Sequence, residues 1–109
     1  MGAREERVAR NETLFREVNE RIKQVNVALA TAEATDFLCE CGDEACTLPI
    51  SLTMTEYEAV RAEATHFAVV SGHVAPDIEV VVAQNDRYMV VAKTDPDAAR
   101  IVEAEDPRS

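Results

Sequence analysis

The sequence predicts a small α+β protein with a long N-terminal helix, a zinc-stapled turn, a short helix and a small antiparallel sheet. Three observations predict it: a heptad-spaced apolar pattern over residues 4–31, three cysteines within eight residues, and two Val-rich runs separated by polar residues. A chain of 109 residues is long enough for one modest core. We therefore expect a single structural domain, with a helical part (residues 1–34) and an acidic α+β part (residues 35–109).

Residues 4 to about 31 are expected to form one helix, because their apolar positions follow heptad spacing and no Gly or Pro interrupts them. Such a helix is about 40 Å long, whereas a compact domain of this size has a radius of gyration of about 13 Å. The helix therefore either lies across the domain and closes it, or pairs with its own copy or another protein. Its apolar positions, here called the heptad stripe, are Val8, Phe15, Val18, Ile22, Val25 and Leu29, with Asn11 at the one polar position.

The segments on either side of the cysteines, residues 36–38 and 48–52, both have an extended pattern, so the cysteines are expected on a hairpin-like turn. Thr53 and Glu56 have the spacing of a capping box, which predicts a short helix over residues 54–64. The core-facing side chains of this helix would be Tyr57, Val60 and Ala64.

Three strands are expected in the second half of the chain. Residues 66–70 form the first, and the Val-rich runs 78–83 and 88–93 form an antiparallel hairpin around residues 84–87. Asp95 followed by Pro96 is a helix-start signal for residues 97–105. The tail after Asp106 is expected to be loose.

The net charge of −10 lies entirely in the second part of the chain. Residues 1–34 carry six basic and six acidic side chains, whereas residues 35–109 carry five basic and fifteen acidic ones. An acidic protein repels phosphate backbones, so we expect no direct binding of nucleic acid. The charge serves solubility or attracts a basic partner.

No apolar run approaches the roughly 20 residues that cross a bilayer, and the charged N-terminus lacks the apolar stretch of a signal peptide. A cytoplasmic protein without membrane contact is therefore expected. In reducing cytosol, clustered cysteines more often bind metal or do redox chemistry than form structural disulfides. The core has no Trp and few aromatic residues, so an added staple would stabilise it.

Cys39, Cys41 and Cys46 are the three cysteines of the chain. A C-x-C pair can place two thiolates on one side of a tight turn, and Gly42 permits the backbone reversal that returns the third thiol to them. Zn²⁺ takes four soft or borderline ligands in a tetrahedron. These residues therefore predict a structural zinc site.

The C-x-C-x4-C spacing resembles the zinc turn that follows the catalytic domain of SET-type methyltransferases, where the fourth ligand comes from elsewhere. The likeness covers eight residues and implies the geometry of the turn, not the activity. His73 follows Gly72 in an expected loop and is favoured as the fourth ligand. The alternatives are His66, Asp36, Asp43, Glu40 or water.

Several segments follow one another in a recognisable order: residues 10–22, 37–42, 52–53, 56–61, 67–69, 72–73 and 87–91. Together they resemble a group of small, uncharacterised, mostly actinobacterial proteins, and the likeness covers nearly the whole chain. It implies that the cysteines and His73 form one constellation. It implies no particular activity.

We therefore expect a non-catalytic, zinc-binding regulatory or adaptor protein that acts through protein–protein contacts of the heptad stripe. A cytosolic thiol redox sensor is the first alternative, although Glu40, Asp43 and Glu44 near the thiols would raise their pKa and slow nucleophilic attack. A metal-dependent enzyme with an open site is the second. The sequence has no phosphate-binding glycine loop and no nucleophile signature, so no catalytic residue is predicted.

Overall fold

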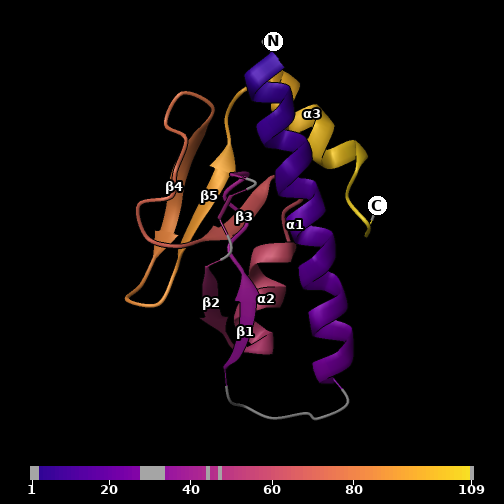
Figure 1. Ribbon diagram of the computed structural model, residues 1–109, viewed down its shortest axis with the longest axis vertical. Coiled ribbons are helices and arrows are strands. Elements are labelled where there is room, and N and C mark those ends of the chain that lie inside the picture. Colours follow the sequence, from indigo (N-terminus) through magenta and orange to yellow (C-terminus); the bar gives the residue numbers. More distant parts are fainter. Residues whose placement is uncertain (1–2, 28–33, 44, 47, 109) are drawn as a thin grey trace.

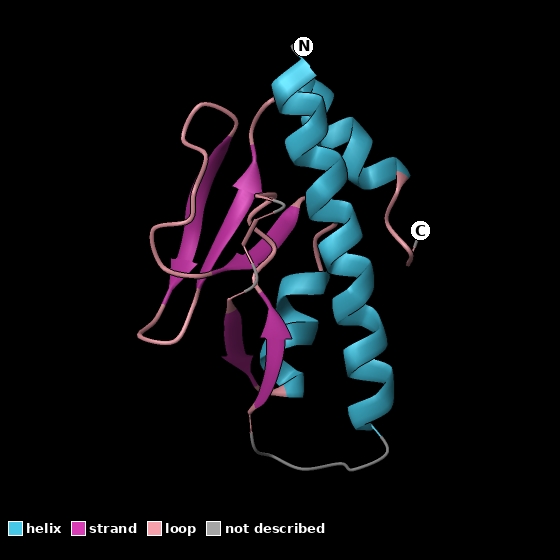
Figure 2. Cartoon of the chain, in the orientation of Figure 1, coloured by secondary structure: helices cyan, strands magenta, loops and turns pink. Residues whose placement is uncertain are grey.

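The computed structural model describes residues 3–27, 34–43, 45–46 and 48–108. These residues form an α+β fold of helices and short antiparallel strands, as the sequence predicts (Figures 1 and 2). In chain order the elements are α1 (Ala3–Val27), β1 (Thr35–Leu38), β2 (Pro49–Leu52), α2 (Met54–Arg61), β3 (His66–Val69), β4 (Glu79–Gln84), β5 (Met89–Lys93) and α3 (Pro96–Ala104).

Helix α1 runs along the whole length of the molecule (Figure 1). Its 25 residues span about 37 Å at 1.5 Å per residue, and the longest dimension of the molecule is 42 Å. The helix packs against α3 and β1. Helix α1 therefore lies across the domain. The last predicted helical residues, 28–31, fall outside the described part of the chain.

Two antiparallel sheets position the cysteine turn. Strands β1 and β2 pair from Thr35 with Leu52 to Leu38 with Pro49, so the cysteines sit in the connection of a hairpin, as expected. The second sheet has the strand order β3-β5-β4, with β5 in the centre. This sheet lies on the side of α1 opposite to α3 in Figure 2, where helices are cyan and strands magenta.

The capping box of α2 is confirmed: the Thr53 hydroxyl accepts from the Glu56 amide at 3.1 Å, and the Glu56 carboxylate accepts from the Thr53 amide at 2.8 Å. The helix ends earlier than expected, at Arg61, because the chain then turns into β3 through a bond from the His66 amide to the Glu63 carbonyl at 3.1 Å. Its buried side chains are Tyr57, Val60 and Arg61.

The expected loose tail after Asp106 is a wrong prediction for residues 107–108. Asp106 is buried and forms an ion pair with Arg61 of α2. Arg108 reaches back to Glu20 on α1 and Glu58 on α2. The tail is therefore fixed by charge pairs, which the hydrophobic pattern of the sequence does not reveal.

The apolar core lies between the two sheets and the three helices. Phe37 and Tyr57 stack at its centre, with ring centroids 4.5 Å apart and planes at 4°. Most of the other large core residues come from strands: Ile50, Leu52, Phe67, Val69, Val90 and Val91, with Val60 and Val102 from helices.

The buried side of α1 is polar. Its fully or almost fully buried residues are spaced three and four apart, which places them on one side of a helix. Their polar contacts reach β5, the end of α3, β1 and α2, so α1 connects the parts of the domain through polar contacts. These buried residues are Ala9, Glu12, Thr13, Arg16, Asn19 and Glu20.

The opposite side of α1 is exposed and carries three apolar residues among charged ones such as Glu17 and Arg21. Leu14, Val18 and Val25 are 55%, 40% and 72% exposed. The heptad stripe therefore does not form the buried side: Val8, Phe15 and Ile22 flank that side and are half-buried, whereas Val18 and Val25 face away. Leu29 lies outside the described residues.

Candidate metal centre

Local hydrogen bonds shape the cysteine turn. The Cys39 amide donates to the Leu48 carbonyl at 3.0 Å, which extends the hairpin by one step beyond β1. The Cys46 amide donates to the Asp43 carbonyl at 2.9 Å, and the Asp43 carboxylate accepts from the Ala45 amide at 2.9 Å. An Asp that binds the backbone two residues later is a common way to close a tight turn.

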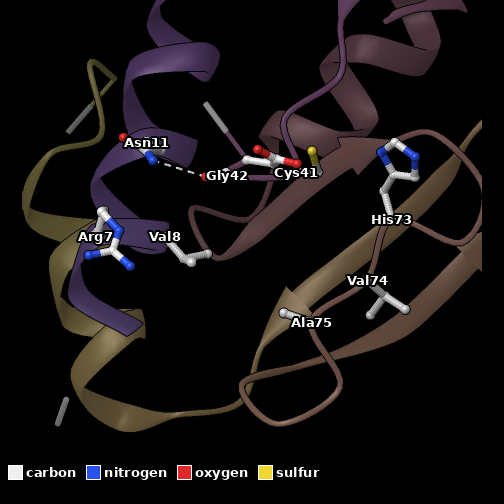
Figure 3. A pocket seen from close by; sticks show the side chains of 9 residues that line it. Arg7, Val8, Asn11, Cys41, Gly42, His73, Val74 and Ala75 are labelled. Atoms are coloured by element: carbon white, nitrogen blue, oxygen red, sulfur yellow. Dashed lines mark hydrogen bonds between the residues drawn. The ribbon is translucent and has the colours of Figure 1, made fainter. Parts of the chain in front are cut away.

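Gly42 fixes the turn against α1. Its φ of +82° lies in the left-handed region, and a Cβ at this position would lie 2.8 Å from Val8 Cγ1 and 2.9 Å from the Val8 carbonyl oxygen. The Asn11 side chain also donates to the Gly42 carbonyl at 3.0 Å (Figure 3). Glycine is therefore required at this position both for its backbone angle and for the close approach of the helix.

His73 enters the site from the loop after β3. The His73 amide donates to the Val70 carbonyl at 2.9 Å and closes a four-residue turn in which Gly72, at φ +91°, holds the third position. The Val70 amide in turn donates to Cys39 Sγ at 3.2 Å. The loop is thus bound to the first cysteine at the same point where it presents the histidine.

The three thiols and the imidazole converge. The potential ligand atoms of Cys39, Cys41, Cys46 and His73 all lie within 4.8 Å of one another. His73 Nδ1 is 3.7 Å from both Cys39 Sγ and Cys46 Sγ. In a tetrahedral zinc site with bonds near 2.3 Å to sulfur and 2.0–2.1 Å to nitrogen, that S···N distance is about 3.6 Å. The group can therefore hold a metal ion.

The alternative fourth ligands are not part of this group. His66 lies on β3, opposite Ala92 of β5. Glu40 points into the core: its carboxylate accepts from the Ala68 amide at 2.9 Å and from the Asn19 side chain at 2.8 Å. Asp43 closes the turn and Asp36 is exposed on β1. Among the described residues, only His73 joins the three cysteines.

Burial, more than the neighbouring carboxylates, raises the pKa of the Cys39 and Cys41 thiols. Burial is the main cause that raises the pKa of Cys39 well above its usual value, and the neighbouring Cys41 and Cys46 raise it further. Burial likewise raises the pKa of Cys41. The Glu40 carboxylate, expected to raise the pKa of the thiols, binds the Ala68 amide and the Asn19 side chain. Without a cation, Cys39 and Cys41 are therefore held as neutral thiols.

Glu40 is a residue whose role the sequence did not suggest. It is fully buried, and burial raises its pKa to about 7, against the lowering effects of Asn19 and the Ala68 amide. The Glu40 amide also donates to the Ala68 carbonyl at 2.9 Å. The residue between two cysteines therefore joins the turn to β3. This role could not be predicted, because the sequence does not show whether an acidic residue between two cysteines is exposed or buried.

A pocket of about 450 Å³ adjoins the four residues (Figure 3). Cys41 and His73 line one side of it, and residues of α1, including Arg7 and Val8, line the other. The remaining lining residues are Asn11, Gly42, Asp43, Val74 and Ala75. The predicted constellation therefore lies at the wall of an open pocket between α1 and the His73 loop.

No family model, curated protein or solved structure matches the chain. The resemblance to small actinobacterial proteins stays a prediction. None of the described helices combines the length and the apolar character of a membrane span.

Proposed function

We propose that this protein is a non-catalytic, zinc-binding regulatory or adaptor protein of the cytoplasm. In this proposal Cys39, Cys41, Cys46 and His73 hold one structural Zn²⁺, and the protein acts by binding another protein. The observation that carries the metal assignment is the convergence of four ligand atoms within 4.8 Å, drawn from two loops that are far apart in sequence.

The donor set supports zinc in a structural role. Three thiolates and one imidazole form a closed tetrahedral set in which every position is filled by the protein, whereas catalytic zinc sites keep one position for water or substrate. Thiolate ligands favour zinc or iron over hard cations such as Mg²⁺. Free energies of structural zinc binding are on the order of 10 kcal/mol, comparable to the whole stability of a small domain.

The exposed side of α1 supports a protein partner. Leu14, Val18 and Val25 are exposed on the side of α1 that does not face the domain, so this face is available without unfolding the domain. Apolar helix faces of this kind dock into grooves or onto other helices. We propose that this face, together with the half-buried Phe15 and Ile22 of the heptad stripe, binds a partner helix or a second copy.

Charge supports a basic partner surface. All five basic residues of 35–109 take part in ion pairs within the chain, so they cannot neutralise the remaining acidic side chains around them. A positive partner would associate faster and more specifically with such a surface. The basic residues concerned are Arg61, Arg87, Lys93, Arg100 and Arg108.

A redox sensor is disfavoured because the raised pKa of Cys39 and of Cys41 leaves little of the reactive thiolate. The pocket favours the remaining alternative, a metal-dependent enzyme, because Cys41 and His73 border an open space of about 450 Å³. An enzyme would lose turnover on chelation without unfolding, whereas a structural ion would leave the chain unfolded when removed.

Native mass spectrometry with elemental analysis tests the metal assignment on the protein purified under reducing conditions. We expect one zinc ion per chain, loss of that ion in His73→Asn, and its retention in His66→Asn, the matched control at the other histidine. A metal-free wild-type protein that melts at the same temperature with and without added zinc would refute the structural role.

Analytical ultracentrifugation and capture experiments test the helix surface. Val18→Asp combined with Val25→Asp should abolish self-association or partner capture while one zinc remains bound. Glu17→Gln combined with Arg21→Gln, on the exposed part of the same helix, is the matched control. Unchanged association of the Asp variant would refute the role of this face.

A further inference from the structure

Strand β4 is an edge strand with an unusual surface. Within the described residues it pairs only with β5, and in Figure 1 it lies on the side of the sheet remote from α1. Glu79 at its start is buried, but all residues from Val80 to Gln84 are exposed. One long side of β4 therefore has backbone groups that no strand of the described fold pairs.

Three consecutive valines on β4 are exposed. Val80, Val81 and Val82 are 48%, 39% and 48% exposed. Val80 and Val81 are adjacent in a strand and so point to opposite faces of the sheet. Edge strands of soluble proteins usually carry charges, proline or a bulge that prevents pairing with another chain. Residues 80–84 contain neither a charge nor proline, and the register with β5 shifts once, between Val81 and Ala83. The strand thus offers apolar contacts on both faces to an additional strand.

The charges at the ends of β4 discriminate between possible occupants. Asp77 and Asp86 are exposed and lie just beyond the two ends of the strand. Antiparallel pairing of β4 with a second copy would bring Asp77 of each chain towards Asp86 of the other at both ends. Like charges across a strand pair are destabilising, and each chain carries a net charge of −10. A strand with basic residues at both ends is complementary instead.

We propose that β4 is the docking edge for an extended segment of another protein that has β-branched apolar residues at its centre and Lys or Arg at both ends. Backbone hydrogen bonds to the free edge supply affinity in this mode, and contacts with alternate side chains supply specificity. The Val80–Val82 patch would be covered on both faces. This surface is separate from α1 and from the metal centre, so it goes beyond the proposed function.

Fluorescence anisotropy tests the proposal with a labelled peptide, Lys-Lys-Val-Thr-Val-Thr-Val-Lys-Lys, and the full-length protein. A peptide with Glu in place of each Lys is the comparison. We expect the basic peptide to bind at least tenfold more tightly than the acidic one. We also expect Val82→Lys to weaken binding at least tenfold and Val82→Thr, which keeps the strand propensity, to weaken it severalfold. Gln24→Lys introduces the same charge at an exposed position on α1, outside the proposed partner face, and should leave binding unchanged.

Hydrogen exchange locates the peptide. Slower exchange of the amides of residues 80–84 on addition of the basic peptide would support strand pairing. Equal affinity for the two peptides, equal loss in Gln24→Lys and Val82→Lys, or unchanged exchange in β4 would overturn the proposal. A dimer of the free protein that Val82→Lys dissociates would also overturn it, because the occupant would then be a second copy.

Discussion

Gly42 of the cysteine turn packs directly on Val8 of α1, where an added Cβ would lie 2.8 Å from Val8 Cγ1. We therefore predict that Gly42→Ala destabilises the protein by about 2–4 kcal/mol, through the strained φ and the clash together. Gly72→Ala is the matched control: its φ is also positive, but no atom lies within 4 Å of the new Cβ. It should cost about 1–2 kcal/mol. Urea unfolding of both variants measures the difference, and equal losses would contradict the close packing of the turn on the helix.

Asn19 should be important for stability. Its side chain donates to the Leu38 carbonyl at 2.8 Å and accepts from the Leu38 amide at 2.7 Å, and it also donates to Glu40. Asn19→Ala would leave these buried groups without partners, so we expect a loss of about 2–4 kcal/mol in chemical denaturation. Asn11→Ala, which removes one half-buried bond to Gly42, should cost about 1 kcal/mol. A larger loss for Asn11→Ala than for Asn19→Ala would contradict the greater importance of the Asn19 hydrogen bonds.

The buried pair at the C-terminal tail should be much stronger than exposed pairs. Asp106→Ala leaves the buried Arg61 guanidinium with one partner fewer, and we expect a loss of about 2–4 kcal/mol. Arg100→Ala removes an exposed pair with Asp97 and should cost less than about 0.5 kcal/mol. Thermal and urea unfolding measure both. If the tail contributed nothing to stability, Asp106→Ala and Arg100→Ala would lower the free energy of unfolding equally.

Glu12 should make the stability fall with rising pH. Burial raises its pKa to about 8 in the folded chain, despite the ion pair with Lys93, against a value of 4.5 for an ordinary Glu. The folded state therefore holds the proton more tightly, and its contribution is complete below about pH 4.5 and is lost as the pH rises through about 8. The loss is on the order of 1 kcal/mol per pH unit in that window.

Glu12→Gln should remove this contribution and leave that of Glu40, whose pKa burial raises to about 7. Urea unfolding at pH 5.5, 6.5 and 7.5 measures the free energy of unfolding of wild type and variant as a function of pH. Both proteins are kept in the same metal state, so the protons released on metal binding affect both equally and cancel in the difference. Glu17→Gln, on the exposed side of the same helix, should keep the wild-type slope. Parallel profiles for wild type and Glu12→Gln would contradict the raised pKa.

The order of the elements was predictable from local signals. The capping box at Thr53, the Asp95-Pro96 helix start and the Val-rich hairpin each rest on residues close together in sequence, and each occurs in the structure. The hairpin around the cysteines followed from the two extended flanks. The grouping of His73 with the cysteines was predictable because the fourth ligand of a cysteine turn comes from a distant loop, and only two histidines are present.

The orientation of α1 was not predictable from its apolar spacing. The helix buries Glu12, Arg16 and Glu20, which an amphipathic pattern assigns to solvent. Their partners lie far along the chain: Arg16 donates to the Val102 carbonyl at 2.7 Å and stacks on Phe67 at 4.5 Å. Such pairing depends on tertiary contacts, so the sequence of one helix does not contain it.

Zinc K-edge X-ray absorption of the reduced, purified protein measures whether Cys39, Cys41, Cys46 and His73 hold one zinc ion. Three sulfur neighbours near 2.3 Å and one nitrogen near 2.0–2.1 Å are expected for a Cys3His site. His73→Asn should replace that nitrogen or release the ion, while His66→Asn should leave the spectrum unchanged. A first shell with fewer than three sulfur atoms, or reduced protein that is well folded and binds no metal, would contradict this zinc site.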